Sequence, residues 1–140
     1  MTIEEKQNEI IEEFAIFSEW MEKYEHLIEM GKELKPLNSI FKTDEHLVKG
    51  CQSQVWLVAK HNNGKLYFEA DSDALITKGI IGLLVRVFSG HSAKEIMDAN
   101  LVFIEKIGLS AHLSPNRANG LASMIKKIKT YAVAYSAINN

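Results

Sequence analysis

The sequence predicts an α+β fold in which a small antiparallel β-sheet packs against N-terminal and C-terminal helices. Three observations support it: an apolar stripe with helical spacing near the N-terminus, a run of β-formers interrupted by Asn63-Gly64, and further helical segments after Asp73. Helices grouped before and after a hairpin are typical of α+β domains. With 140 residues, of which 46% are hydrophobic, the chain can bury a core. We therefore expect a single domain over residues 1–140.

The first helix is expected to begin near the N-terminus, because Thr2 and Glu5 have the spacing of a capping box. We expect Gly31 to end it. Residues 1–30 carry nine acidic residues and two lysines, which we interpret as a solvated helix face. The apolar stripe recurs every three or four residues and comprises Ile10, Phe14, Phe17, Met21, Tyr24 and Ile28. Residues 31–46 are expected to be irregular.

A β-hairpin is predicted over residues 54–60 and 65–70, which are rich in β-branched, aromatic and other apolar residues. Asn63-Gly64 favours the type I′ turn that joins two antiparallel strands. A short strand over residues 46–49 is expected to add a third partner. Trp56 lies in the alternating pattern of the first strand and is expected to be in the core.

The next helix is predicted over residues 74–88 and is ended by Ser89-Gly90. Asp71 or Asp73 precedes it, and we expect Asp73 to cap it.

The remaining chain is predicted to be helical as well. Ser92 and Glu95 form a second capping box, residues 100–106 form a short helix that stops at Gly108, and Ser114-Pro115 begins the last helix. The stripe of the last helix comprises Leu121, Met124, Ile125, Ile128, Tyr131 and Tyr135.

Composition excludes several classes of function. A net charge of −2 argues against a nucleic-acid partner, and no apolar run approaches the roughly 20 residues that span a bilayer. One cysteine excludes an internal disulfide, a redox pair and a zinc site built on several thiolates, and it fits a reducing, cytoplasmic setting. The five histidines are not spaced as a local helical metal pair, and we expect no bound metal.

Cys51 has the sequence context of a reactive thiol. Gly50 precedes it and frees the backbone to turn, Gln52 and Ser53 follow with amide and hydroxyl donors, and Lys49 is close in sequence. These conditions lower a thiol pKa and favour the thiolate. A buried, inert thiol is the alternative that the sequence leaves open.

A solitary thiolate can attack an electrophile and hold the product until an outside acceptor arrives. A cysteine-dependent enzyme is the second hypothesis, and it would need His46, His91 or His112 as a base beside Cys51. The third is a non-catalytic binding module or a cluster scaffold, although a scaffold needs several thiolate ligands.

Three segments closely resemble the SufE-type sulfur acceptor proteins: VKGCQSQVWL at 48–57, DSDALITKGIIGLL at 71–84 and IGLSAHLSPNRANGLASMIKKI at 107–128. The resemblance covers roughly residues 46–128. Gly82 departs from it, since many relatives have a small residue such as Ala there, and the departure affects helix packing. The fold that the resemblance implies is the SufE/NifU-like α+β fold.

The resemblance also implies a function. Such a protein accepts sulfane sulfur from a cysteine desulfurase as a persulfide, stimulates that enzyme, and delivers the sulfur to an iron–sulfur cluster assembly scaffold. The implied partners are a SufS-type desulfurase, which carries pyridoxal phosphate, and a SufBCD-type scaffold, while the acceptor itself binds no cofactor and has no turnover of its own. A CsdE-type paralogue that serves a different desulfurase or acceptor is the closest alternative.

Residue roles follow from the same motifs. Cys51 is the implied nucleophile and persulfide carrier. Gly50 would let the loop extend into the partner, and Gln52 and Ser53 would orient or stabilise the sulfur anion. The positions implied to bind the partner or support the loop are Arg117, Asp71 and Asp73, and a plain helix-surface arginine is the alternative for Arg117. Because an exposed persulfide is easily lost, we expect a sheltered Cys51 on a mobile loop over residues 46–53.

Overall fold

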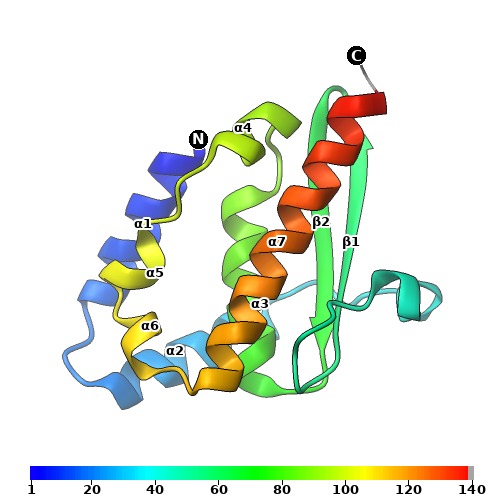
Figure 1. Ribbon diagram of the computed structural model, residues 1–140. Coiled ribbons are helices and arrows are strands. Elements are labelled where there is room, and N and C mark those ends of the chain that lie inside the picture. The colour runs from blue at the N-terminus through cyan, green and yellow to red at the C-terminus, as the bar shows by residue number, and fades with distance from the viewer. Residues whose placement is uncertain (139–140) are drawn as a thin grey trace.

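The computed structural model describes residues 1–138 and confirms the α+β prediction (Figure 1). Two N-terminal helices precede a β-hairpin, and helices form the rest of the chain. The elements are α1 (Ile3–Ala15), α2 (Trp20–Lys32), β1 (Val55–Asn62), β2 (Lys65–Ser72), α3 (Leu75–Phe88), α4 (Ala93–Asp98), α5 (Phe103–Lys106), α6 (Leu109–His112) and α7 (Pro115–Ile138), with short 3₁₀ turns η1 (Ser39–Phe41) and η2 (Asp44–His46). Among the helices of residues 1–138, none combines the length and hydropathy that crossing a bilayer requires.

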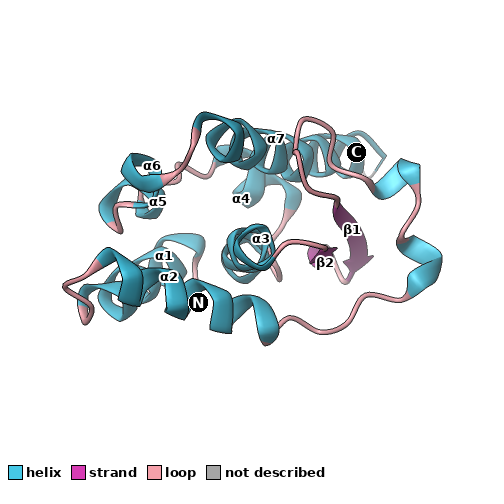
Figure 2. Cartoon of the chain, turned by 90° about the horizontal axis from the view of Figure 1, so that it is seen from below, coloured by secondary structure: helices cyan, strands magenta, loops and turns pink. Residues whose placement is uncertain are grey.

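Helix α3 lies at the centre of the molecule. Figure 2 looks nearly along its axis and shows α1 and α2 on one side, α7 on the opposite side and the hairpin on a third. A helix enclosed in this way must be apolar around its whole circumference. Most of α3 is indeed buried, including Ile80, Leu83 and Leu84.

The hairpin matches the prediction in position and turn chemistry. Its antiparallel register runs from Val55↔Ser72 to Asn62↔Lys65. Asn63 and Gly64 have φ of 52° and 78°, and a type I′ turn requires positive φ at both central positions. The face that packs on the core carries Val55, Leu57, Leu66, Phe68 and Ala70, all of them buried.

The expected third strand is reduced to a single bridge, Leu47↔Trp56, with one adjacent bond from the Val48 N–H to the Val55 carbonyl at 2.7 Å. The η2 turn precedes this pair, and Gly50, at φ 95°, turns the chain away after it. The expectation that Trp56 lies in the core is also wrong. Trp56 is half-buried on the outer face of the hairpin, where the Lys42 ammonium lies 5.4 Å from its ring centroid.

The N-terminal helix is broken into α1 and α2, contrary to the prediction of one helix. The break lets α2 fold back, so that the His26 ring packs at 5.0 Å from Phe14 and 5.2 Å from Phe17, centroid to centroid. The apolar stripe does not continue through the break in one register. Met21 is 67% exposed, whereas Leu27 is buried.

Gly31 does not end the helix but lies within α2, where that helix crosses α3. A Cβ atom on Gly31 would lie 2.8 Å from the Gly79 backbone nitrogen, and one on Gly79 would overlap the Leu27 carbonyl oxygen. The two glycines therefore permit a backbone-to-backbone approach of α2 and α3 that no larger residue allows.

The later elements largely follow the prediction. Ser92 and Glu95 form the expected capping box of α4, and α7 begins at Pro115 with the Arg117 N–H donating to the Ser114 hydroxyl at 3.3 Å. The helix predicted over 100–106 is shorter, and α6 follows it without having been predicted.

Candidate functional site

Cys51 lies on the loop that leads into β1, and this loop packs against the second turn of α7. The thiol donates a weak hydrogen bond to the Gly120 carbonyl at 3.6 Å. Two glycines make this approach possible. A Cβ on Gly120 would lie 3.2 Å from the Cys51 Sγ, and one on Gly50 would lie 2.5 Å from the Ser123 Oγ. Gly50 also has φ of 95°, a conformation that only glycine adopts without strain.

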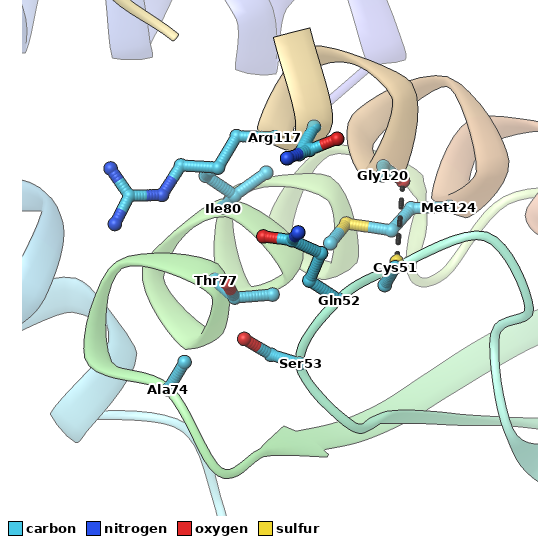
Figure 3. Close-up of a pocket in the computed structure, with 10 residues that line it drawn as sticks. Cys51, Gln52, Ser53, Ala74, Thr77, Ile80, Arg117, Gly120 and Met124 are labelled. Atoms are coloured by element: carbon cyan, nitrogen blue, oxygen red, sulfur yellow. Dashed lines mark hydrogen bonds between the residues drawn. The ribbon is translucent and has the colours of Figure 1, made fainter. Parts of the chain in front are cut away.

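A cavity of about 110 Å³ opens beside the cysteine (Figure 3). Its walls come from three places in the sequence: the cysteine loop, the first two turns of α3 and the first three turns of α7. The lining residues are Cys51, Gln52, Ser53, Ala74, Thr77, Ile80, Asn116, Arg117, Gly120 and Met124. Packing of the loop against the starts of two helices thus brings the cysteine next to a small, partly polar space.

The thiol is half-buried, and this burial raises the pKa of Cys51. The expectation that its neighbours lower the pKa is therefore wrong for this loop conformation. The side chain of Lys49 is exposed and makes no ion pair within residues 1–138, whereas the sulfur faces α7. The sheltered position expected of Cys51 is observed, and mobility of the loop remains a prediction.

Gln52 and Ser53 line the cavity, but no hydrogen bond links either of them to the sulfur among the described residues. Their assigned role in stabilising a sulfur anion stays a prediction.

Arg117 contacts α2 and not the cysteine. Its Nη1 donates to the Tyr24 hydroxyl at 2.6 Å, and Figure 3 shows its guanidinium directed away from Cys51. The arginine thus joins the start of α7 to α2 and lines one wall of the cavity. A direct contact with the desulfurase remains a prediction.

Neither aspartate caps α3, contrary to the expectation for Asp73. The N-cap is Ala74, whose side chain offers no acceptor. The Asp73 carboxylate instead accepts from the Gln54 N–H at 3.0 Å, across the end of the hairpin. Asp71 forms ion pairs with Lys42 at 2.9 Å and Lys78 at 3.4 Å. Burial alone would raise the pKa of Asp71, but the hydrogen bonds from Lys42 and the Ser72 N–H, with the nearby Lys78 charge, lower it. Asp73 therefore joins the two ends of the hairpin, and Asp71 joins the segment around Lys42 to α3.

No histidine lines the cavity of Cys51. Each has contacts elsewhere: His26 with Glu13, His46 with Thr43, His61 with Tyr135, His91 with Glu95 and His112 with the Gly108 carbonyl. Within residues 1–138 there is also no group of three or more His, Cys, Asp or Glu side chains that could hold a metal ion. The arrangement favours chemistry at the sulfur alone.

A family model described as "SufE: Fe-S metabolism associated domain" matches residues 8–132. The chain belongs to the SufE family. An uncharacterised SufE-like protein of Rhizobium meliloti is 46% identical over 132 residues, which cover 89% of this chain and 93% of that protein. SufE-like protein 1, chloroplastic/mitochondrial, of Arabidopsis thaliana is 43% identical over 129 residues, which cover 91% of this chain and 35% of that protein.

The fold is shared with a solved structure as well. The solution structure of a hypothetical protein from Thermus thermophilus superposes with a TM-score of 0.76 at 20% identity and covers 96% of this chain and 97% of that one. SufE membership gives this chain a sulfur-transfer role in iron–sulfur metabolism, in association with a cysteine desulfurase.

Several residues of the site were not assigned from the SufE motifs. Asn116 and Gly120 lie in the segment at 107–128 and Thr77 in the segment at 71–84, yet nothing local indicated that they face Cys51. The glycine at 120 was the available signal, because a glycine inside a strong helix often marks a close approach.

Proposed function

We propose that this SufE-family protein accepts sulfane sulfur from a SufS-type cysteine desulfurase as a persulfide on Cys51, stimulates that enzyme and delivers the sulfur to a SufBCD-type scaffold. The observation that carries the proposal is the position of the chain's only cysteine on a glycine-hinged loop beside a small cavity. Neither a histidine base nor a metal-ligand cluster accompanies it among the described residues.

The proposed transfer is a thiol–persulfide exchange. The Cys51 thiolate attacks the outer sulfur of the desulfurase persulfide and forms a new S–S bond, while the old S–S bond breaks and its electron pair stays on the desulfurase cysteine. The outer sulfur keeps its proton. A second exchange, in which an acceptor thiolate attacks the outer sulfur on Cys51, releases Cys51 as a thiolate.

Burial of the thiol supports a carrier that is inactive until it meets its partner. The raised pKa keeps Cys51 protonated while the loop rests on α7, and a protonated thiol is a poor nucleophile. Only a weak hydrogen bond to Gly120 holds the sulfur there. We infer that the desulfurase draws out the loop over residues 46–53, with Gly50 as the hinge, and that the thiolate forms at the partner's site.

Membership of the SufE family supports these partners. Pyridoxal phosphate belongs to the desulfurase in this proposal, and the acceptor contributes only its sulfur and its binding surface. The single cysteine fits a reducing compartment, and we place the relay in the cytoplasm. A CsdE-type paralogue would perform the same exchange with a different desulfurase.

A mass spectrum tests the proposal. The protein is mixed with a SufS-type desulfurase, pyridoxal phosphate and L-cysteine, and its mass is measured without reductant. We expect a gain of one sulfur atom on Cys51, which dithiothreitol removes.

Cys51→Ser provides the matched control, because it replaces only the sulfur atom by an oxygen atom and leaves the rest of the loop unchanged. This variant should gain no sulfur. Sulfur at another residue, or a wild-type thiol that reacts only after denaturation even with the desulfurase present, would reject the relay.

A further inference from the structure

Thr77 is a largely buried residue whose hydroxyl group has no hydrogen-bond partner among the described residues and which lines the cavity of Cys51. Only 8% of its surface is exposed. An unpaired hydroxyl in the wall of a cavity is free to donate a hydrogen bond to a group that binds there.

The first turn of α3, to which Thr77 belongs, lacks a cap. Ala74 occupies the N-cap position with φ −118° and ψ 134°, and no side chain accepts from the first turn. The N–H groups of Leu75, Ile76 and Thr77 accordingly have no acceptor among the described residues. Unpaired N–H groups and the positive end of the helix dipole favour an anion at this position.

The cavity has room for one more atom on the cysteine. A persulfide extends the side chain by an S–S bond of about 2.05 Å. The space of about 110 Å³ far exceeds the roughly 10–15 Å³ that one water molecule requires by the same measure. Figure 3 shows Thr77 and Cys51 on opposite sides of the Gln52 side chain. A persulfide that extends toward Thr77 must therefore displace the Gln52 side chain. This side chain is exposed and makes no hydrogen bond within residues 1–138, so its displacement breaks no hydrogen bond.

The charged groups around the cavity have other partners. Arg117 is bound to Tyr24, Asp73 accepts from the Gln54 N–H, and Lys78 is paired with Asp71. Lys49 is exposed and does not line the cavity. Neutral donors in the cavity wall therefore remain to hold a negative charge, and on α3 this donor is the Thr77 hydroxyl.

We propose that the first turn of α3, through the Thr77 hydroxyl and the uncapped N–H groups beside it, binds the outer sulfur anion of the Cys51 persulfide. This inference rests on the proposed function and adds a binding residue to the carrier state. A persulfide ionises more readily than a thiol, so the loaded form needs donors that the unloaded form does not. The unloaded thiol uses the Gly120 carbonyl, an acceptor, which suits a protonated sulfur and repels an anion.

Thr77→Val and Thr77→Ser test the hydroxyl. Each protein is loaded with inorganic polysulfide, from which the Cys51 thiolate takes one sulfane sulfur and leaves a polysulfide shorter by one atom. Alkylation of loaded and unloaded Cys51 by iodoacetamide is then followed by mass spectrometry between about pH 4 and pH 11, a range that extends well to either side of the ordinary thiol pKa because burial raises the pKa of Cys51.

Thr77→Val, which keeps the shape and removes the donor, should raise the pH midpoint of the persulfide by about one unit. The midpoint of the unloaded thiol should stay in place, and Thr77→Ser should resemble the wild type. An unchanged persulfide midpoint in Thr77→Val, or equal shifts of persulfide and thiol, would overturn the proposal.

Ala74→Asp tests the start of α3, because it should stabilise the fold and weaken the binding of the sulfur anion. The extended backbone of residue 74 suits an aspartate N-cap, which should raise the melting temperature. The same carboxylate would occupy the free N–H groups and repel the sulfur anion, so the persulfide midpoint should rise by about one unit or more. A more stable variant with an unaltered persulfide midpoint would contradict the inference.

Polysulfide loading separates this inference from the proposed function. If the desulfurase transfers no sulfur to wild-type Cys51, the relay is wrong, whereas the midpoints of chemically loaded protein still decide the role of Thr77.

Discussion

At the scale of single residues, the reactivity of Cys51 is decided by packing and not by its neighbours in sequence. Gly50, Gln52 and Ser53 suggest an activated thiol, but contact with α7 buries the sulfur and raises its pKa. The contact depends on the absence of a side chain at Gly120. The close fit of the cysteine loop against α7 therefore shields the resting thiol from solvent.

Replacing Gly120 with alanine should release the thiol. The new Cβ would lie 3.2 Å from the Sγ, so the cysteine must move by a few tenths of an ångström or leave the contact. Alkylation of Cys51 by iodoacetamide should become several-fold faster. Because alanine in a helix interior is favoured over glycine by about 1 kcal/mol, the melting temperature should not fall.

The denatured wild type supplies the upper limit of the alkylation rate. A Gly120→Ala protein that alkylates at the wild-type rate would show that burial on α7 does not limit the reactivity of the thiol.

At the scale of elements, the crossing of α2 and α3 sets the position of the first turn of α3. Gly31 and Gly79 let the two backbones touch. The same crossing brings Tyr24 of α2 within reach of Arg117 at the start of α7. A shift of α2 would therefore disturb two walls of the cysteine cavity.

Gly79→Ala should be strongly destabilising, by about 2 kcal/mol or more, because its Cβ would overlap the Leu27 carbonyl and the backbone cannot yield locally. Urea unfolding measures the change. Gly82→Ala on the same helix is the matched control, since its Cβ would meet nothing closer than the Leu34 side chain at 3.4 Å. Equal effects of the two substitutions would mean that the crossing tolerates a wider separation.

At the scale of the whole molecule, the turn after α3 joins three parts of the fold. The His91 carbonyl accepts from the Leu66 N–H at 2.8 Å, Gly90 donates to the Leu66 carbonyl at 2.7 Å, and the Lys6 ammonium of α1 donates to the Ser89 carbonyl at 2.7 Å. The His91 side chain is buried beneath this junction, 4% exposed, and its Nε2 has no partner in the described residues.

The stability of the protein should fall as the pH drops below about 6.5. Burial, with the nearby Lys6 charge, lowers the pKa of His91 despite the opposing effect of Glu95. The unfolded chain then binds the proton at a higher pH than the folded one, so the free energy of unfolding decreases from about pH 6.5 down to the folded pKa. The expected loss in this window is of the order of 1 kcal/mol, measured by urea unfolding at about pH 7.5 and pH 5.0.

His91→Gln should reduce the difference in the free energy of unfolding between the two pH values. His61→Gln, at an exposed position on β1, should leave it as in the wild type. The lowered pKa values of Glu13 and Asp71 act in a separate, more acidic window, because their stabilising contribution is lost only as these carboxylates take up protons. If His91→Gln and the wild type lose equal stability, His91 does not carry the effect.

Local signals determined much of the fold. The hairpin turn at Asn63-Gly64, the capping box of α4 and the start of α7 at Pro115 each depend on residues within four positions of one another, and each was predicted correctly. The sequence motifs around Cys51 likewise indicated the SufE family, which the family model and the relatives confirm.

The tertiary structure alone decided how the site is built. The Cys51–Gly120 contact joins residues 69 positions apart, and the Arg117–Tyr24 bond joins residues 93 positions apart. Such pairs leave no periodic trace in the chain, because they form only when packing of α3 fixes the surrounding helices. For the same physical reason the break between α1 and α2, the missing cap of α3 and the place of Thr77 in the wall of the Cys51 cavity were decided by burial and long-range contact, which outweigh local preference.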